Sequence, residues 1–195
     1  MNKIKFLAFA GIALALSVAF GSCAKPPVAE MDAATAAVSR AESDADVVAY
    51  AADSLKRAKD SLARMQGEAD AKRYDAAKTL ALETVQAAEK AIADGKTGKE
   101  RAKQTATDLV GAIKASLVEA ENALASARRT RGVKLDFNSI STEIAEVRNA
   151  TGAFESDFNA GNYRGAVQKG ETLRSKLADI VNRISEAVRA ASRKK

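Results

Sequence analysis

The chain has 195 residues, a formal net charge of +6 and 44 alanines, close to a quarter of its length. Two prolines, 5% aromatic residues and no tryptophan exclude a disordered chain and argue against a β-sandwich. Because histidine is absent and only one cysteine is present, the usual general base, zinc ligands and Cys–His dyads are missing. We therefore expect no enzyme, no metal and no other cofactor.

Residues 1–22 have the pattern of an export signal, with two lysines ahead of an apolar stretch from Phe6 to Phe20. At 1.5 Å per residue this stretch is too short to cross a hydrocarbon core of about 30 Å comfortably. The signal ends in Phe20-Gly21-Ser22-Cys23, which resembles the bacterial lipobox. The resemblance implies that Cys23 receives the lipid before cleavage; an ordinary secretory signal with an incidental cysteine is the alternative.

Acyl chains on Cys23 would anchor the mature protein, because each buried CH₂ contributes about 0.8 kcal/mol. Ala24 follows the cysteine, where the inner-membrane retention signal of enteric bacteria has Asp. We therefore expect a lipoprotein that carries palmitate, sits in the outer membrane and faces the periplasm. Removal of the two signal lysines lowers the net charge from +6 to +4.

Apolar residues recur at steps of three and four through the rest of the chain, which is the helical signature. The pattern predicts an all-α fold, an elongated bundle of helical hairpins with long antiparallel helices. We divide the mature chain into an N-terminal Ala-rich region at residues 23–131 and a C-terminal hairpin at 132–195. The expected helical runs cover residues 28–45, 48–69, 74–92, 102–127, 140–158 and 163–188.

Turn-prone residues mark three expected breaks between helices. Residues 43–46 can end the first helix and cap the second, residues 131–134 join the two halves, and residues 159–162 separate the last two helices. Gly95 and Gly98 leave two alternatives equally weighted, a break or one rod from residue 74 to 129 of about 80 Å.

A weak internal repeat relates residues 65–77 to residues 154–166, with an offset of 89 residues. In both copies a tyrosine, Tyr74 or Tyr163, opens a helix directly after a turn and stands three residues before an alanine. The pattern predicts that each tyrosine packs across the mouth of a hairpin. Coincidence among Ala-rich helices is the alternative.

Residues 26–95 resemble a bacterial Ala-rich lipoprotein domain of the DUF series, of the kind sometimes found ahead of an OmpA-like module. The features that match are Pro26-Pro27, Met31, the run from Tyr50 to Leu55, and the segment from Tyr74 to Glu83. No OmpA-like module follows in this sequence, so peptidoglycan binding through that module is not implied.

Two basic features are the candidate sites. Arg128, Arg129, Arg131 and Lys134 cluster between the two halves and can contact an anionic surface, or can simply complement helix ends. The ending Arg193-Lys194-Lys195 resembles that of the murein lipoprotein of enteric bacteria, which implies Lys195 as a point of covalent attachment to the wall.

These observations predict a non-enzymatic, lipid-anchored scaffold or adaptor of the cell envelope. Its expected partners are the membrane, through the acyl chains, and an envelope protein or peptidoglycan. Nucleic acid is not expected, since the basic segments lack stacking aromatics. The alternative is a periplasmic binding or carrier protein that holds an apolar ligand or lipid within the bundle.

Overall fold

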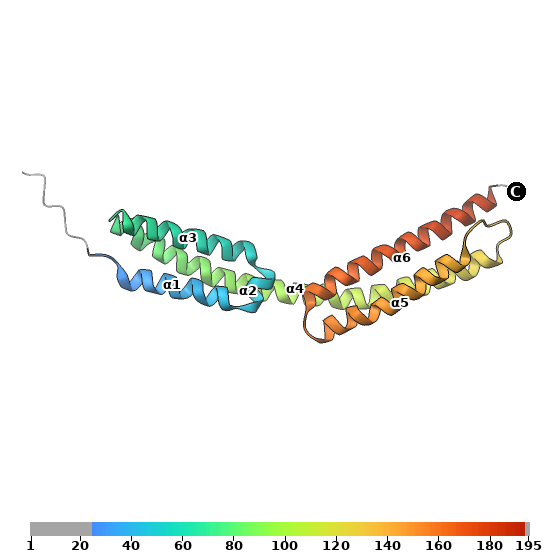
Figure 1. Cartoon of the computed structure of the whole chain (residues 1–195), viewed down its shortest axis with the longest axis horizontal. Helices are drawn as coiled ribbons and strands as arrows, with labels where there is room; N and C mark the ends of the chain where they lie inside the picture. Colours follow the sequence, from blue (N-terminus) through green and yellow to red (C-terminus); the bar gives the residue numbers. More distant parts are fainter. Residues whose placement is uncertain (1–24, 194–195) are drawn as a thin grey trace, which may run out of the picture.

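The computed structural model describes residues 25–193 and arranges them as two short bundles joined by one long helix (Figure 1). No strand occurs in this part of the chain, and the predicted all-α fold is confirmed. The helices are α1 (Val28–Ser43), α2 (Ala45–Tyr50), α3 (Ala52–Asp70), α4 (Tyr74–Arg129), α5 (Phe137–Asn159) and α6 (Tyr163–Ser192).

The N-terminal bundle consists of α1, α2 and α3 packed against the first half of α4. Its core is built mainly from alanines, with Val38, Val47, Met65 and Leu80 as the larger buried side chains. Small side chains on facing helices let the backbones approach closely. The buried alanines are Ala34, Ala37, Ala41, Ala51, Ala58, Ala77, Ala81, Ala88 and Ala91.

Helix α4 is continuous over 56 residues, so the chain has one rod through Gly95 and Gly98 and no break there. Both glycines lie where α2 crosses α4. A Cβ at Gly95 would be 2.8 Å from the backbone N of Val47, and a Cβ at Gly98 would be 2.7 Å from Cβ of Tyr50. Real side-chain carbons do not approach so closely, so these glycines serve the packing of α2 within an unbroken helix.

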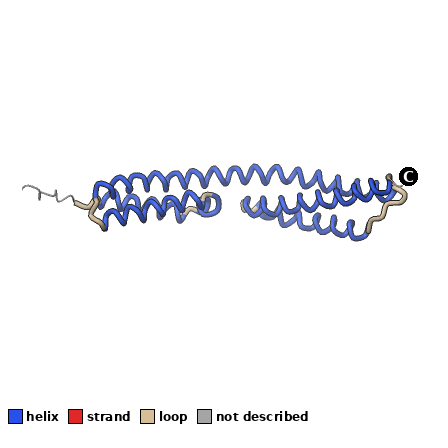
Figure 2. The backbone as a smooth tube through the Cα atoms, turned by 90° about the horizontal axis from the view of Figure 1, so that it is seen from above, coloured by secondary structure: helices blue, strands red, loops and turns tan. Residues whose placement is uncertain are grey.

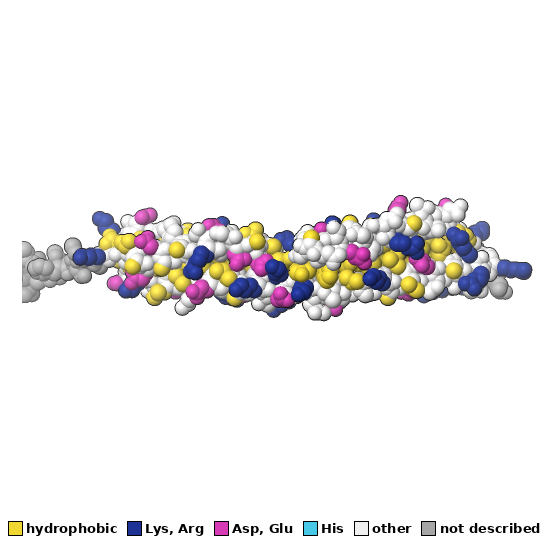
Figure 3. All heavy atoms as spheres, turned by 90° about the horizontal axis from the view of Figure 1, so that it is seen from below, with side chains coloured by type: hydrophobic (Ala, Val, Ile, Leu, Met, Phe, Trp, Pro, Cys, Tyr) yellow, Lys and Arg dark blue, Asp and Glu magenta, His cyan; other side chains and the backbone are white. Residues whose placement is uncertain are grey.

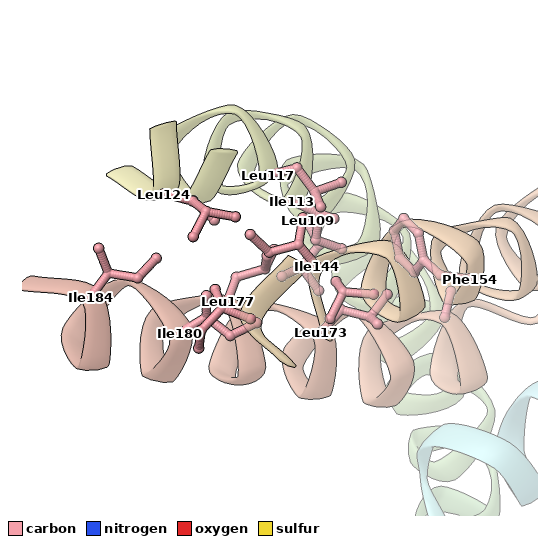
Figure 4. Packing of buried hydrophobic residues seen from close by; sticks show 14 of the residues in the cluster. Leu109, Ile113, Leu117, Leu124, Ile144, Phe154, Leu173, Leu177, Ile180 and Ile184 are labelled. Carbon is pink, nitrogen blue, oxygen red and sulfur yellow. The ribbon is translucent and has the colours of Figure 1, made fainter. Parts of the chain in front are cut away.

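The C-terminal bundle consists of the second half of α4 packed with α5 and α6. Its core is aliphatic with one aromatic ring, and Figure 4 shows side chains from all three helices pointing toward one another. Ile144 and Val147 of α5 share this core with Leu173 and Leu177 of α6, as the predicted antiparallel return requires. The turn at residues 160–162 separates α5 from α6, where the sequence predicted a break at residues 159–162.

The predicted second helix has the expected cap at residues 43–46, but the structure divides it into α2 and α3. Asp44 caps α2 by accepting hydrogen bonds from the backbone N–H groups of Asp46 and Val47, at 2.8 and 3.2 Å. The chain then turns at Ala51 (φ −133°), which separates α2 from α3. As a result Val47 is buried and Val48, expected on the apolar face, is 54% exposed. The prediction of one helix over residues 48–69 is therefore wrong at its first turn.

The two hairpin turns that the predicted repeat relates have the same backbone hydrogen bonds. The N–H of Arg73 donates to the carbonyl of Glu68, and 89 residues later the N–H of Asn162 donates to the carbonyl of Asp157, both at 2.9 Å. The middle of each turn has positive φ, 58° at Lys72 and 77° at Gly161. Each turn is followed directly by the helix that a tyrosine opens, α4 in the first copy and α6 in the second.

The molecule is a rod whose two bundles lie along α4 (Figure 2). At 1.5 Å per residue, the 56 residues of α4 span about 84 Å. The first described residues and the α3–α4 turn are at one end, and the α4–α5 connection with the end of α6 is at the other (Figures 1 and 2). Of the helices in residues 25–193, none has the length and apolarity needed to cross a membrane.

Candidate functional site

The structure brings the four predicted basic residues together at the rod end distant from residue 25 (Figure 1). Arg128 and Arg129 form the last turn of α4, and Arg131 and Lys134 lie in the connection that follows. All four are exposed. Gly132 turns this connection with a φ of +82°, a conformation that favours glycine.

Helix α6 ends at the same place and adds two further cations. A Cβ at Gly132 would be 4.0 Å from Cβ of Ala191, so the connection lies directly against the last turn of α6. Arg189 stands in that turn and Arg193 caps it. In the sequence, the basic residues that end the chain are far from the cluster of residues 128–134, and no pattern there distinguishes Arg189. The folding back of α6 along α4 unites them.

We call this surface the basic tip. It consists of Arg128, Arg129, Arg131, Lys134, Arg189 and Arg193. Figure 3 shows Lys and Arg side chains gathered at this end of the rod.

No carboxylate within the described residues forms an ion pair with a cation of the basic tip. The ion pairs of residues 25–193 involve other cations along the rod, and none of the six tip residues is among them. The nearby Asp136 instead caps α5, accepting hydrogen bonds at 3.0 Å from the N–H groups of Asn138 and Ser139. The tip therefore keeps a net positive charge, with six cations against the nearby carboxylate of Asp136.

Some cations of the basic tip make contacts within their own part of the chain that explain their presence without a partner. The guanidinium of Arg128 lies 5.8 Å from the ring centroid of Phe137 and donates to the carbonyl of that residue at 3.4 Å. The Nε of Arg129 donates to the carbonyl of Ala125 at 3.2 Å. Cations in the last turns of α4 and α6 also complement the negative helix ends. Arg131 and Lys134, past the end of α4, have no such local role.

The carboxylates with shifted pKa values are held in their charged form by cationic or hydroxyl partners. Hydrogen bonds from Arg183 lower the pKa of Glu143, with desolvation opposing. Hydrogen bonds from Ser54 and then Lys90 lower the pKa of Asp94. Both belong to contacts that hold neighbouring helices or turns together. No cluster of acids or thiols within residues 25–193 could hold a metal ion.

A polar hollow of about 540 Å³ lies at the waist, where the two bundles meet. The α2–α3 corner and α4 form most of it, and Arg164 closes it from the first turn of α6. Nη1 of Arg164 donates to the carbonyl of Ala49 at 2.9 Å and so links the two bundles. Three arginines and two aspartates share the hollow, which leaves it with mixed charge: Arg57, Arg101, Arg164, Asp53 and Asp94.

A second hollow, of about 450 Å³, is a groove between α5 and α6. It combines the apolar Val147, Leu173 and Ile180 with acidic side chains such as Glu146 and Asp179. Of the buried alanines of the N-terminal bundle, Ala51 lines the waist hollow, and none lines this groove. Two predicted site residues, Cys23 and Lys195, lie outside the described residues.

Comparison with known proteins bears on the N-terminal bundle. Residues 29–107 match the family model described as Domain of unknown function (DUF4398). This match confirms the DUF-series resemblance that the sequence placed on residues 26–95. The DUF4398 segment covers α1, α2, α3 and the part of α4 that packs with them. Neither a curated protein nor a solved structure matches the chain.

Proposed function

We propose that the protein is a lipid-anchored, non-enzymatic spacer of the bacterial cell envelope, fixed to the outer membrane at Cys23 and extending into the periplasm. Its action would be geometric. The acyl chains hold one end of the rod, and the helices carry the opposite end to a defined distance from the membrane.

The observation that supports this proposal is the continuity of α4. One helix runs through both bundles and separates the α3–α4 turn from the basic tip by about 84 Å. The described chain begins at Lys25, at the end of the rod opposite the tip, and Cys23 precedes it by two positions in the sequence. A lone helix of this length bends readily, whereas helices packed along both halves stiffen it.

One contact at the waist joins the two bundles: Arg164 of α6 donates to the carbonyl of Ala49 in α2. Within the N-terminal bundle, Lys99 of α4 forms an ion pair with Asp46 of α2 at 3.0 Å and so holds α2 on α4. The close approach of α2 at Gly95 adds packing at the same point. A spacer needs such support where the two bundles abut.

Depth measurement in a bilayer tests the proposal. The acylated protein is placed in zwitterionic vesicles that contain a lipid-phase quencher, with a fluorophore on Asp70→Cys or on Arg131→Cys. Both positions are exposed: Asp70 ends α3 at the same end of the rod as Lys25, and Arg131 lies in the tip. Acylation blocks Cys23, so only the introduced thiol is labelled.

We expect quenching at position 70 and none at position 131, because the tip is about 84 Å farther along the rod. The Cys23→Ser protein, carrying the same labels, is the control and should show no quenching at either site. Equal quenching at both positions of the anchored protein would mean that the rod lies flat on the bilayer, and the spacer proposal would then be wrong.

A further inference from the structure

We propose that the basic tip docks on an anionic phospholipid surface, so that the rod joins the membrane that holds its acyl chains to a second bilayer. The bridging part rests on the proposed spacer function, whereas the lipid affinity of the tip can be tested by itself.

Charge is the first argument. Six cations from α4, the α4–α5 connection and α6 meet at the tip, and none is in an ion pair within the described residues. Five of them are arginines, whose planar guanidinium forms paired hydrogen bonds with phosphate oxygens. Each Lys or Arg near an anionic bilayer strengthens binding about fivefold, the equivalent of about 1 kcal/mol. A cluster of this size is of the kind that recognises anionic headgroups.

Shape is the second argument. The tip is the end of a rod, and its Arg128 lines a shallow hollow of about 310 Å³ beside Leu124 and Ile144. The other five present their charges outward from helix ends and a short connection. Such a surface fits an extended sheet of negative charge better than a small ligand that must be enclosed.

The lack of a free aromatic ring at the tip bears on which class of polyanion the tip can bind. Its nearest ring, Phe137, is half-buried and lies against the guanidinium of Arg128. The tip therefore offers no free ring on which a base or a sugar could stack. The absence of a free ring disfavours single-stranded nucleic acid and glycan strands, whose recognition uses stacking, and leaves a surface that acts through charge, as an anionic bilayer requires.

The position of the tip selects a second bilayer. The described chain begins beside the α3–α4 turn, and α4 separates that turn from the tip by about 84 Å. An upright rod keeps the tip far beyond the few nanometres over which headgroup charge acts, since screening at physiological salt decays over about 8 Å. The tip then meets whatever anionic surface lies opposite.

The first experiment tests the tip without the anchor. The signal-free Cys23→Ser protein is sedimented with vesicles of phosphatidylcholine alone or with phosphatidylglycerol added. We expect binding to the second kind only, lost when salt rises toward 1 M, where the Debye length falls to about 3 Å. Equal binding to both vesicles, or binding to purified peptidoglycan in place of either, would overturn the inference.

Matched charge variants locate the binding surface. The triple variant Arg131→Gln, Lys134→Gln and Arg193→Gln removes three tip charges that lie outside helix interiors. Its control removes three exposed cations along the rod: Lys96, Lys103 and Arg174. We expect a loss of about a hundredfold for the tip variant and under about threefold for the control, with equal melting temperatures. Equal losses would mean that net charge, and not the tip, carries the binding.

The second experiment tests bridging. The thiol of Cys23, the chain's only cysteine, couples the signal-free protein to a maleimide lipid in zwitterionic vesicles, and phosphatidylglycerol vesicles of a second colour are added. We expect co-sedimentation of the two populations, and its loss in the tip variant. Binding in the first experiment without bridging in the second would refute the spacer and leave the lipid affinity standing; no binding in the first would refute the tip inference itself.

Discussion

Two glycines of α4 allow a direct test of how the N-terminal bundle is packed. A glycine in a helix interior is less favourable than alanine by about 1 kcal/mol, so replacement by alanine should stabilise a helix wherever there is room. Gly111 has room: a Cβ there would have no neighbour within 4 Å. Gly95 does not, because its Cβ would lie 2.8 Å from the backbone N of Val47 and 3.0 Å from both Cα of Val47 and the carbonyl carbon of Asp46.

The magnitude follows from those contacts. All three atoms near Gly95 belong to the backbone of α2, so a rotamer change cannot relieve the overlap and the helix must move. Overpacking of this kind costs about 1–3 kcal/mol. Since both variants gain the same helix propensity, we expect Gly111→Ala to raise the free energy of unfolding by about 1 kcal/mol and Gly95→Ala to be lower than Gly111→Ala by about 1–3 kcal/mol.

Urea unfolding of the signal-free protein, followed by circular dichroism, measures the difference. The dependence of unfolding free energy on urea should be the same in both variants, so that the midpoints report stability. If Gly95→Ala proved as stable as Gly111→Ala, α2 would not press on α4, and the explanation of a glycine pair inside an unbroken helix would be wrong.

Three further predictions concern anchoring, packing and pH. Labelled palmitate should enter the wild-type protein and not Cys23→Ser, and equal labelling would refute lipidation. Phe154 is fully buried, so Phe154→Ala should cost about 3–5 kcal/mol, against under about 0.5 for Glu155→Ala, with a melting temperature independent of protein concentration; a midpoint that rises with concentration would indicate an oligomer. Arg183 holds the pKa of Glu143 below its ordinary value of 4.5, so this stabilisation is present above that pH and is lost as the pH falls through the lower, folded-state pKa. The melting temperature should drop less on acidification in Glu143→Gln than in the wild type, and identical pH profiles would contradict the assignment.

Local signals in the sequence predicted most of the helical architecture. The cap at Asp44, the turn at residues 159–162 and the helix starts at Tyr74 and Tyr163 depend on residues close together in the chain, and all are confirmed. The interruption at Ala51 has no such signal. Alanine is the best helix former, and this break comes from the packing of α2 across α4, not from local preference.

The basic tip was predictable only in part for a related reason. Arg128, Arg129, Arg131 and Lys134 are neighbours in sequence and were recognised as a cluster. Their proximity to α6 depends on the length of that helix and on its return along α4 from a turn about thirty residues away. Sequence periodicity predicts that a helix exists more reliably than it predicts where the far end of the helix will lie.

The repeat shows which features of a hairpin persist when its core changes. The turn depends on backbone hydrogen bonds and one residue of positive φ, and these recur at an offset of 89 residues whether that residue is Lys72 or Gly161. The cores differ in side-chain size: Ala88 corresponds to Leu177. The difference is compensated where the helices meet. Met65 shares a cluster with Ala81 in the first copy, whereas in the second the larger Phe154 faces Gly170, whose added Cβ would lie 3.0 Å from the ring.

The two copies therefore divide side-chain volume differently between their facing helices, while the geometry of the turn is the same. An alanine core draws the helices of the DUF4398 segment close together and requires glycine where α2 crosses α4. An aliphatic core in the second bundle fills its interior with larger side chains and requires glycine opposite its one buried ring. Both bundles share α4, so the alanine core and the aliphatic core follow one another along the same helix. The change from one core to the other falls between Gly98 and Ala106, at the waist. Neither core extends across that point, and the hydrogen bond from Arg164 to the carbonyl of Ala49 joins the bundles there, while the Lys99–Asp46 ion pair holds α2 on α4 within the first bundle.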